Sequence, residues 1–146
     1  MDFTFERISY AALNARQQEN YNFQKISAVL ADFGFTTIRL SDDWNGADFL
    51  ALHRGGETLK VQLKGRLCFH EKYRGKELWV CFPDGADWYI YPHDKLLENI
   101  LDSTNVATTS SWKDHGGYSF PGLSAQMKSM LVPYRLEALP SVGVPK

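Results

Sequence analysis

Two short runs of alternating residues, 48–53 and 58–63, are separated by only the four residues Arg54 to Glu57, which include two adjacent glycines. Glycine adopts without strain the positive φ angles that tight turns between antiparallel strands demand. The two runs therefore predict a β-hairpin, and this hairpin constrains the rest of the fold and the placement of its polar residues.

The register of this hairpin decides which polar side chains meet. Successive side chains of a strand point to opposite faces, so Lys60, Gln62 and Lys64 share one face. A simple two-residue loop would place Asp48 opposite Leu63, on the wrong side for these polar residues. A three-residue loop or a bulge shifts the register and brings Asp48 across from Gln62 or Lys64. If the hairpin carries a site, we expect it to have such an irregularity.

The stretch from Asn14 to Phe33 predicts a helix, because its apolar residues recur at spacings of three and four. Gly34 follows where a C-cap glycine belongs. Asn14 and Gln17 resemble a capping pair, although the helix could also begin nearer Ser9.

Glu19 heads the apolar stripe of this helix, which continues through Phe23, Ile26, Leu30 and Phe33. One interpretation is an exposed acid that interacts favourably with the positive end of the helix dipole. The alternative is that Glu19 points inward because a cation lies between it and Asp48.

The remaining pattern adds strands and helices in an order typical of one α/β domain. The predicted strands are one at 35–40, which ends in the acidic turn SDDWNG, and an antiparallel pair at 78–82 and 88–91. A helix capped by Asp94 and running to Leu101 follows, then a long loop at 102–122, and finally a helix capped by Ser124 and stopped by Pro133. We expect a mixed β-sheet core flanked by helices, with 1–146 as a single domain, a core at about 9–101, and a C-terminal loop and helix at 102–135.

Composition excludes several classes of protein. No stretch approaches the roughly 20 apolar residues of a membrane span, and the first residues do not resemble a secretory signal. Cys68 and Cys81 are embedded in strand-like runs, which suits reduced, buried thiols. The four histidines lack ligand-like spacing, so a zinc site is not expected. Together these features predict a cytoplasmic protein.

Positive charge is concentrated between Lys60 and Glu77, where six lysines and arginines stand against two glutamates, although the net charge of the chain is −1. This surplus could face phosphates or could be a solvated loop that happens to be basic. Aromatic and polar residues in the segment 102–122 could also reach a groove or stack on a base, although aromatics in a small domain more often pack inside it. The candidates for nucleic-acid binding are Lys60, Arg66, Lys72, Arg74, Lys76, Trp112, Lys113, His115 and Tyr118.

Four features in order, Glu19 on the first helix, "GF" at 34–35, "NGADFLAL" at 45–52 and "VQLK" at 61–64, resemble the PD-(D/E)XK nuclease superfamily. The superfamily includes restriction enzymes, junction resolvases, repair nucleases and some homing endonucleases. The resemblance covers about residues 17–66 and implies a restriction endonuclease-like fold.

The resemblance also implies a set of site residues. Asp48 matches the motif aspartate, with Ala47 where proline often stands. Gln62 takes the Asp/Glu position, as in a variant used by some active members, and Lys64 is the motif lysine. An amide oxygen is a weaker ligand than a carboxylate for a hard cation, and Glu19, which matches a helix glutamate of some branches, could offset the missing charge.

By the same resemblance, Mg²⁺, with Mn²⁺ able to substitute, is held by Asp48, Gln62 and the Leu63 main-chain carbonyl. Glu19 holds a metal-bound water or a second ion. Lys64 orients the attacking water or helps to deprotonate it, and it neutralises charge at the phosphate. Without a site, Lys64 would simply form a salt bridge to Asp48 across the hairpin.

The implied function is a metal-dependent DNA endonuclease of homing or restriction type, acting as a homodimer or higher homo-oligomer because duplex cleavage needs two active sites. A junction-resolving or repair nuclease is one alternative, and a non-catalytic nucleic-acid-binding domain of the same fold is another. RNA stays open as a substrate. An interaction domain unrelated to nucleases would instead leave Glu19 and Asp48 far apart.

Overall fold

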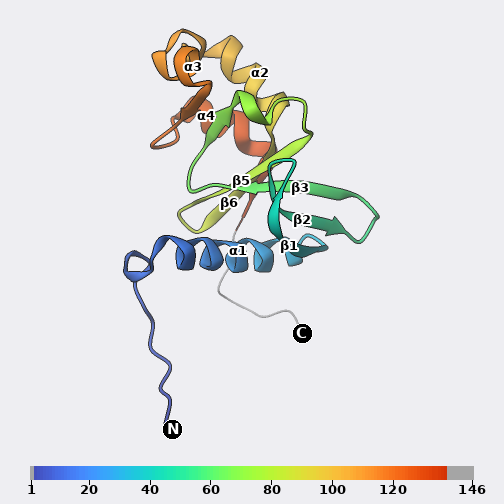
Figure 1. The fold of residues 1–146 in the computed structure, drawn as a ribbon, viewed down its shortest axis with the longest axis vertical. Coiled ribbons are helices and arrows are strands. Elements are labelled where there is room, and N and C mark those ends of the chain that lie inside the picture. Colours follow the sequence, from blue (N-terminus) through green and yellow to red (C-terminus); the bar gives the residue numbers. More distant parts are fainter. Residues whose placement is uncertain (1, 138–146) are drawn as a thin grey trace.

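A six-stranded mixed sheet forms the middle layer of the computed structural model, which describes residues 2–137 (Figure 1). Neighbouring strands follow the order β1-β2-β3-β5-β6-β8 and are antiparallel, except that β3 and β5 are parallel. The strands are β1 (Phe35–Trp44), β2 (Ala47–His53), β3 (Thr58–Leu63), β5 (Leu78–Asp84), β6 (Asp87–Pro92) and β8 (Arg135–Leu136). A second sheet pairs β4 (Cys68–His70) with β7 (Gly117–Ser119). The predicted fold class, a single α/β domain with a mixed sheet flanked by helices, is confirmed.

Helices cover both faces of the main sheet. Helix α1 (Ala15–Ala31) lies along one face, while α2 (His93–Ser103), α3 (Ser110–His115) and α4 (Ala125–Leu131) gather on the other side (Figure 1). The alternation of β5 serves both layers, because Val80 and Phe82 pack in the cluster with α2 and α4, whereas Cys81 packs in the cluster with α1. Both faces of the central strands are therefore buried.

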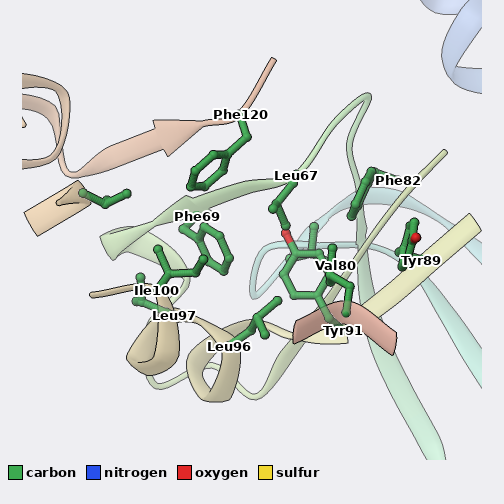
Figure 2. Packing of buried hydrophobic residues seen from close by; sticks show 12 residues of the cluster. Leu67, Phe69, Val80, Phe82, Tyr89, Tyr91, Leu96, Leu97, Ile100 and Phe120 are labelled. Atoms are coloured by element: carbon green, nitrogen blue, oxygen red, sulfur yellow. The ribbon is translucent and has the colours of Figure 1, made fainter. Parts of the chain in front are cut away.

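The larger core lies between β4, β5, β6 and α2, where Phe69, Tyr91 and Leu97 pack together (Figure 2). Tyr91 is 0% exposed, and its hydroxyl donates a hydrogen bond to the Cys68 carbonyl at 2.6 Å. A buried hydroxyl needs such a partner. The bond ties β4, and with it the chain that follows the β2–β3 hairpin, to the main sheet.

Helix α1 begins at Ala15, and the predicted capping box is confirmed: the Asn14 side chain accepts from the Gln17 N–H, and the Gln17 side chain accepts from the Asn14 N–H, both at 2.9 Å. The predicted inward position of Phe33 is wrong, because this side chain is 45% exposed. The helix ends at Ala31, and Gly34 has a φ of 85°, so Phe33 leaves the apolar stripe before it could be buried.

The predicted acidic turn after residue 40 is also wrong. Strand β1 continues to Trp44, and the turn is Asn45-Gly46, whose φ angles of 53° and 85° fit a type I′ hairpin. The pairing of β1 with β2 shifts between Arg39 and Trp44. This irregularity gives β1 extra residues next to the start of β2, including Asp43.

The C-terminal part contains more regular structure than predicted. Segment 102–122 is not a long loop, because it forms α3 and β7 and is anchored by the buried side chains of Val106 and Phe120. Helix α2 begins at His93 after Pro92, so Asp94 does not cap it and instead accepts a hydrogen bond from the Gly75 N–H. The predicted cap of α4 is confirmed, since the Ser124 side chain accepts from the Met127 N–H.

Cys68 and Cys81 are both free thiols, and Cys81 is fully buried. Within residues 2–137, no helix combines the length and the apolar character needed to cross a bilayer.

Candidate functional site

The β2–β3 hairpin has the irregularity that a site requires. Its loop has three residues, 54–56, because the His53 N–H donates to the Glu57 carbonyl at 2.8 Å. Phe49 consequently pairs with Val61, and the same register continued by one residue places Asp48 opposite Gln62. The expectation of a shifted register is confirmed, and Asp48 shares a face of the hairpin with Gln62.

Asp48 is half-buried at the start of β2, and its Oδ2 accepts a hydrogen bond from the Leu63 N–H at 2.8 Å. Burial raises the pKa of this carboxyl group, and the negative charges of Glu19 and Asp43 raise it further. The hydrogen bond from the Leu63 N–H and the positive charge of Lys64 lower the pKa but do not cancel the rise. The ionised carboxylate therefore lies among like charges, and a bound cation would relieve this repulsion.

Lys64 follows β3 and stays fixed to the sheet, because its N–H donates to the Cys81 carbonyl at 2.9 Å. Its Nζ lies 5.7 Å from the centroid of the Tyr73 ring. Burial lowers the pKa of Lys64. The hydrogen bond and charge interaction with the Tyr73 side chain, and to a smaller extent the charges of Cys68 and Asp48, outweigh burial, so the pKa is raised. Lys64 is thus a cation at neutral pH, and the ion pairs within residues 2–137 do not include a direct pair with Asp48.

An acidic hollow of about 200 Å³ opens between α1 and the hairpin, lined by Glu19, Asp42, Asp43 and Asp48 together with Phe23, Arg39, Leu40, Ser41 and Leu63. Glu19 is exposed, as expected of an acid near a helix N-terminus, and it does not head a buried stripe. It nevertheless lines the same hollow as Asp48. The charge of Glu19 also acts on the Asp48 carboxyl group.

A second hollow of about 240 Å³ brings the three motif residues Asp48, Gln62 and Lys64 together. We call it the motif hollow; its other lining residues are Asp43, Gly46, Lys72, Tyr73 and Lys76. Asp43 and Asp48 line both hollows. Charge thus changes from acidic to basic along one continuous surface that crosses the hairpin.

The acids of this surface fit a hard cation that keeps most of its water. Among the described residues, no group of three His, Cys, Asp or Glu side chains is arranged to hold a metal ion. Mg²⁺ does not need such a group, because it is commonly held by one or two carboxylates together with waters and substrate phosphates. Asp48 supplies one such carboxylate, and its Oδ1 has no hydrogen-bond partner among the described residues. Gln62 lines the motif hollow with Asp48, and Leu63 lines the acidic hollow with it.

The other predicted nucleic-acid contacts divide into two groups. Lys72 and Lys76 line the motif hollow, and Arg66 lies beyond Lys64 with an exposed side chain. Lys60 and Arg74 have partners within the protein, since the Lys60 Nζ lies 5.9 Å from the Trp44 ring centroid and Arg74 forms an ion pair with Glu71 at 2.9 Å.

The predicted contacts in segment 102–122 are partly engaged in packing. Trp112 and Tyr118 are half-buried against the core, and the Tyr118 ring centroid lies 4.7 Å from that of Phe120. Lys113 and His115 are exposed on α3. Packing therefore accounts for Trp112, whereas Tyr118 and His115 also line a pocket beside Lys64.

Sequence reasoning missed Asp43 and Tyr73. The signal for Asp43 was the Asn-Gly pair at 45–46, because a type I′ turn there extends β1 and places the preceding acids beside Asp48. Tyr73 gives no such signal, since a single tyrosine in a basic loop carries no pattern, yet it is only 4% exposed and is the partner of Lys64.

Comparisons of the chain with protein-family models, with curated proteins and with solved structures find no match. The argument for a function therefore depends on the geometry of the hairpin and its two hollows.

Proposed function

We propose that this protein is a metal-dependent endonuclease that hydrolyses phosphodiester bonds in DNA, with its active site on the β2–β3 hairpin. The observation that carries the proposal is the register of the hairpin, which gathers Asp48, Gln62 and Lys64 in one hollow. The raised pKa of Asp48 supports it, because burial and neighbouring acids make the site unfavourable for a bare carboxylate.

The residues that would hold Mg²⁺ or Mn²⁺ are Asp48, Gln62 through its side-chain oxygen and Leu63 through its carbonyl. Glu19 would act through a metal-bound water. The ion supplies charge neutralisation and a water molecule of lowered pKa. Asp43 joins this set from β1, because its charge acts on Asp48 and it lines both hollows. The acidic hollow thus compensates for the neutral amide at Gln62.

Lys64 would orient the attacking water or help to deprotonate it. The raised pKa of Lys64 in the metal-free protein favours its ammonium form, which suits the first role. An ammonium group here would also stabilise the negative charge that develops on the phosphate in the transition state. The Tyr73 side chain holds this ammonium group beside the motif hollow.

The substrate and assembly follow from the surface around the site. Lys72 and Lys76 extend the positive charge from Lys64 and suit phosphates on either side of the scissile one. Cleavage of both strands of a duplex needs a second copy of this single site, so we propose a homodimer or higher homo-oligomer on duplex DNA. The free thiols of Cys68 and Cys81 favour action in the cytoplasm.

The proposal is tested by cleavage of supercoiled plasmid, linear duplex, single-stranded DNA, RNA and a four-way junction in Mg²⁺ or EDTA. We expect Mg²⁺-dependent cleavage that Asp48→Asn abolishes and that Asp84→Asn leaves intact, because Asp84 is an exposed acid that lines neither hollow. Preference for the junction would identify a resolving nuclease. Metal-independent binding without cleavage of any substrate would contradict the proposal and favour a non-catalytic binding domain.

A further inference from the structure

A separate pocket of about 290 Å³ lies beyond Lys64 and is lined by residues of the paired strands β4 and β7, of the 3-10 turn that follows β4 and of α3. This volume is close to the lower end of the roughly 300–1,000 Å³ typical of small-ligand sites. We call it the β4–β7 pocket. It shares Lys64, Lys72 and Tyr73 with the motif hollow, so the two are adjacent.

The β4–β7 pocket is positively charged. Its lining among residues 2–137 includes Lys64 and Lys72 but no carboxylate. The pKa of His70 reflects this charge. Burial lowers the pKa, and the positive charges of Lys72 and Lys64 lower it further. An anionic ligand would therefore be favoured at the end of the pocket where the two lysines lie.

The remaining lining is aromatic and polar rather than aliphatic. Tyr118, a half-buried residue whose ring centroid lies 4.7 Å from that of Phe120, lines the pocket next to Ser119. Ser111 and His115 contribute a hydroxyl and an imidazole from α3. An aromatic side chain with nearby donors and acceptors suits the face and the edge of a nucleobase, in the way that single-strand-binding proteins hold bases.

The wall of the pocket is held rigidly by His93, which is 0% exposed. Its Nε2 accepts a hydrogen bond from the His70 N–H at 3.1 Å, and its Nδ1 pairs with Asp94 Oδ1 at 2.8 Å. Asp94 also accepts from the Gly75 N–H at 2.9 Å. Residues 70–75 are thus fastened at both ends to the start of α2. A ligand would meet a preformed pocket, which lowers the entropy cost of binding.

We propose that the β4–β7 pocket binds one nucleotide of the substrate strand, next to the phosphate that is cleaved. Lys64 and Lys72 contact its phosphate, Tyr118 lies against its base, and the α3 side chains contact the base edge. This inference rests on the proposed nuclease function. It makes the preferred substrate a strand with an unpaired or extruded nucleotide beside the cleavage site, since a paired base is not free to enter a pocket.

The test is binding of three probes to the full chain in EDTA, where metal-dependent cleavage is suppressed: a single-stranded tetranucleotide, dTMP and inorganic phosphate. Backbone amide shifts report the location of binding. We expect the tetranucleotide to shift the amides of Gly117, Tyr118 and Ser119 together with those of Gln62 and Lys64, and to bind at least about tenfold more tightly than dTMP, because it also reaches phosphate contacts outside the pocket.

A variant pair tests the pocket itself. Ser119→Glu places a carboxylate on the exposed β7 position that lines the pocket, and we expect about tenfold weaker binding of the tetranucleotide because this charge faces its phosphate. Ser129→Glu adds the same charge to an exposed position on α4 that does not line the pocket, and we expect no change. The wild-type amide shifts decide the question even if Ser119→Glu perturbs the fold.

Shifts confined to the hairpin amides would overturn the nucleotide pocket and leave the proposed nuclease intact. Equal affinity for dTMP and the tetranucleotide would also overturn it, in favour of a site for free mononucleotides. Equal weakening by both glutamate variants would show that charge alone, and not this pocket, governs binding. No shift at either location with any probe would count against the pocket and the nuclease together.

Discussion

The carboxylate of Asp48 is half-buried beside Glu19 and Asp43, and this placement makes its ionised form unfavourable in the metal-free protein. A carboxyl group whose pKa is raised by folding stabilises the fold at low pH, and that contribution is lost as the pH rises through the folded pKa. At neutral pH, where the carboxyl group is ionised, such an arrangement lowers the stability of the fold. Arrangements of this kind are characteristic of sites kept for function.

We expect Asp48→Asn to leave the free energy of unfolding in EDTA at pH 7 equal to or above that of the wild type. The amide removes the charge, and its oxygen can still accept from the Leu63 N–H. Denaturant unfolding between pH 4 and 8, with Asp84→Asn as the control, measures this. The wild type should also gain thermal stability on addition of Mg²⁺, and Asp48→Asn should not. A loss above about 1 kcal/mol in EDTA would instead make Asp48 a structural residue.

His93 has the opposite dependence on pH. Burial lowers its pKa, so the unfolded chain takes up a proton that the folded chain resists. The stability associated with neutral His93 is complete above its ordinary pKa of about 6.5 and is lost as the pH falls through the folded pKa. The nearby pairing with Asp94 opposes this shift without reversing it.

We expect His93→Ala to lower the free energy of unfolding at pH 7.5 by about 1–3 kcal/mol, because the His70 N–H loses its buried acceptor. The wild type should lose stability between pH 7.5 and 5.5, and the variant should lose less. The charge of His93 also contributes to the lowered pKa of His70, so the difference in slope reports His93 together with its effect on His70. Parallel slopes would contradict a neutral, buried His93.

At the scale of elements, the three-residue loop of the β2–β3 hairpin sets the register on which the site depends. Gly56 has a φ of 108°, and a Cβ added there would meet nothing within 4 Å. Any cost of replacing it therefore comes from the backbone alone.

We expect Gly56→Ala to lower the free energy of unfolding by about 1–2 kcal/mol, because an L side chain disfavours positive φ. Gly122→Ala is the matched control, since Gly122 also has open space but no positive φ, and it should change stability little. Thermal and denaturant unfolding of both variants measures the difference. Equal effects would mean that the loop does not enforce this backbone conformation.

Some elements were predictable because local chemistry decides them. The α1 capping box needs only Asn14 and Gln17 at the right spacing, and the hairpin needs only alternation around paired glycines. The end of β1 was not predicted, because SDDW is rich in turn-forming residues, and among these four only Trp44 has a registered partner on β2. Strands as short as β4 and β7 carry too few residues to show any alternation.

At the scale of the whole molecule, the candidate site combines residues whose proximity can be predicted from the sequence with residues whose proximity cannot. Asp48, Gln62 and Lys64 belong to one hairpin, so their meeting follows from its register. Asp43 reaches them through the irregular end of β1, and Tyr73 through a crossover between β3 and β5 that is fixed by the start of α2. Both faces of the sheet that carries these parts are covered by helices (Figure 1).

The central claim is that the hairpin is the active site of a nuclease, and the rate of Mg²⁺-dependent nicking of supercoiled plasmid by Lys64→Ala tests it most directly. Lys128→Ala is the control, because Lys128 is an exposed lysine on α4 that does not line the motif hollow. We predict a loss of about 10²–10³-fold for Lys64→Ala, as when one stabilising donor is removed from a transition state, and little change for Lys128→Ala. Equal activity of the two variants, or activity that persists in EDTA, would contradict the account.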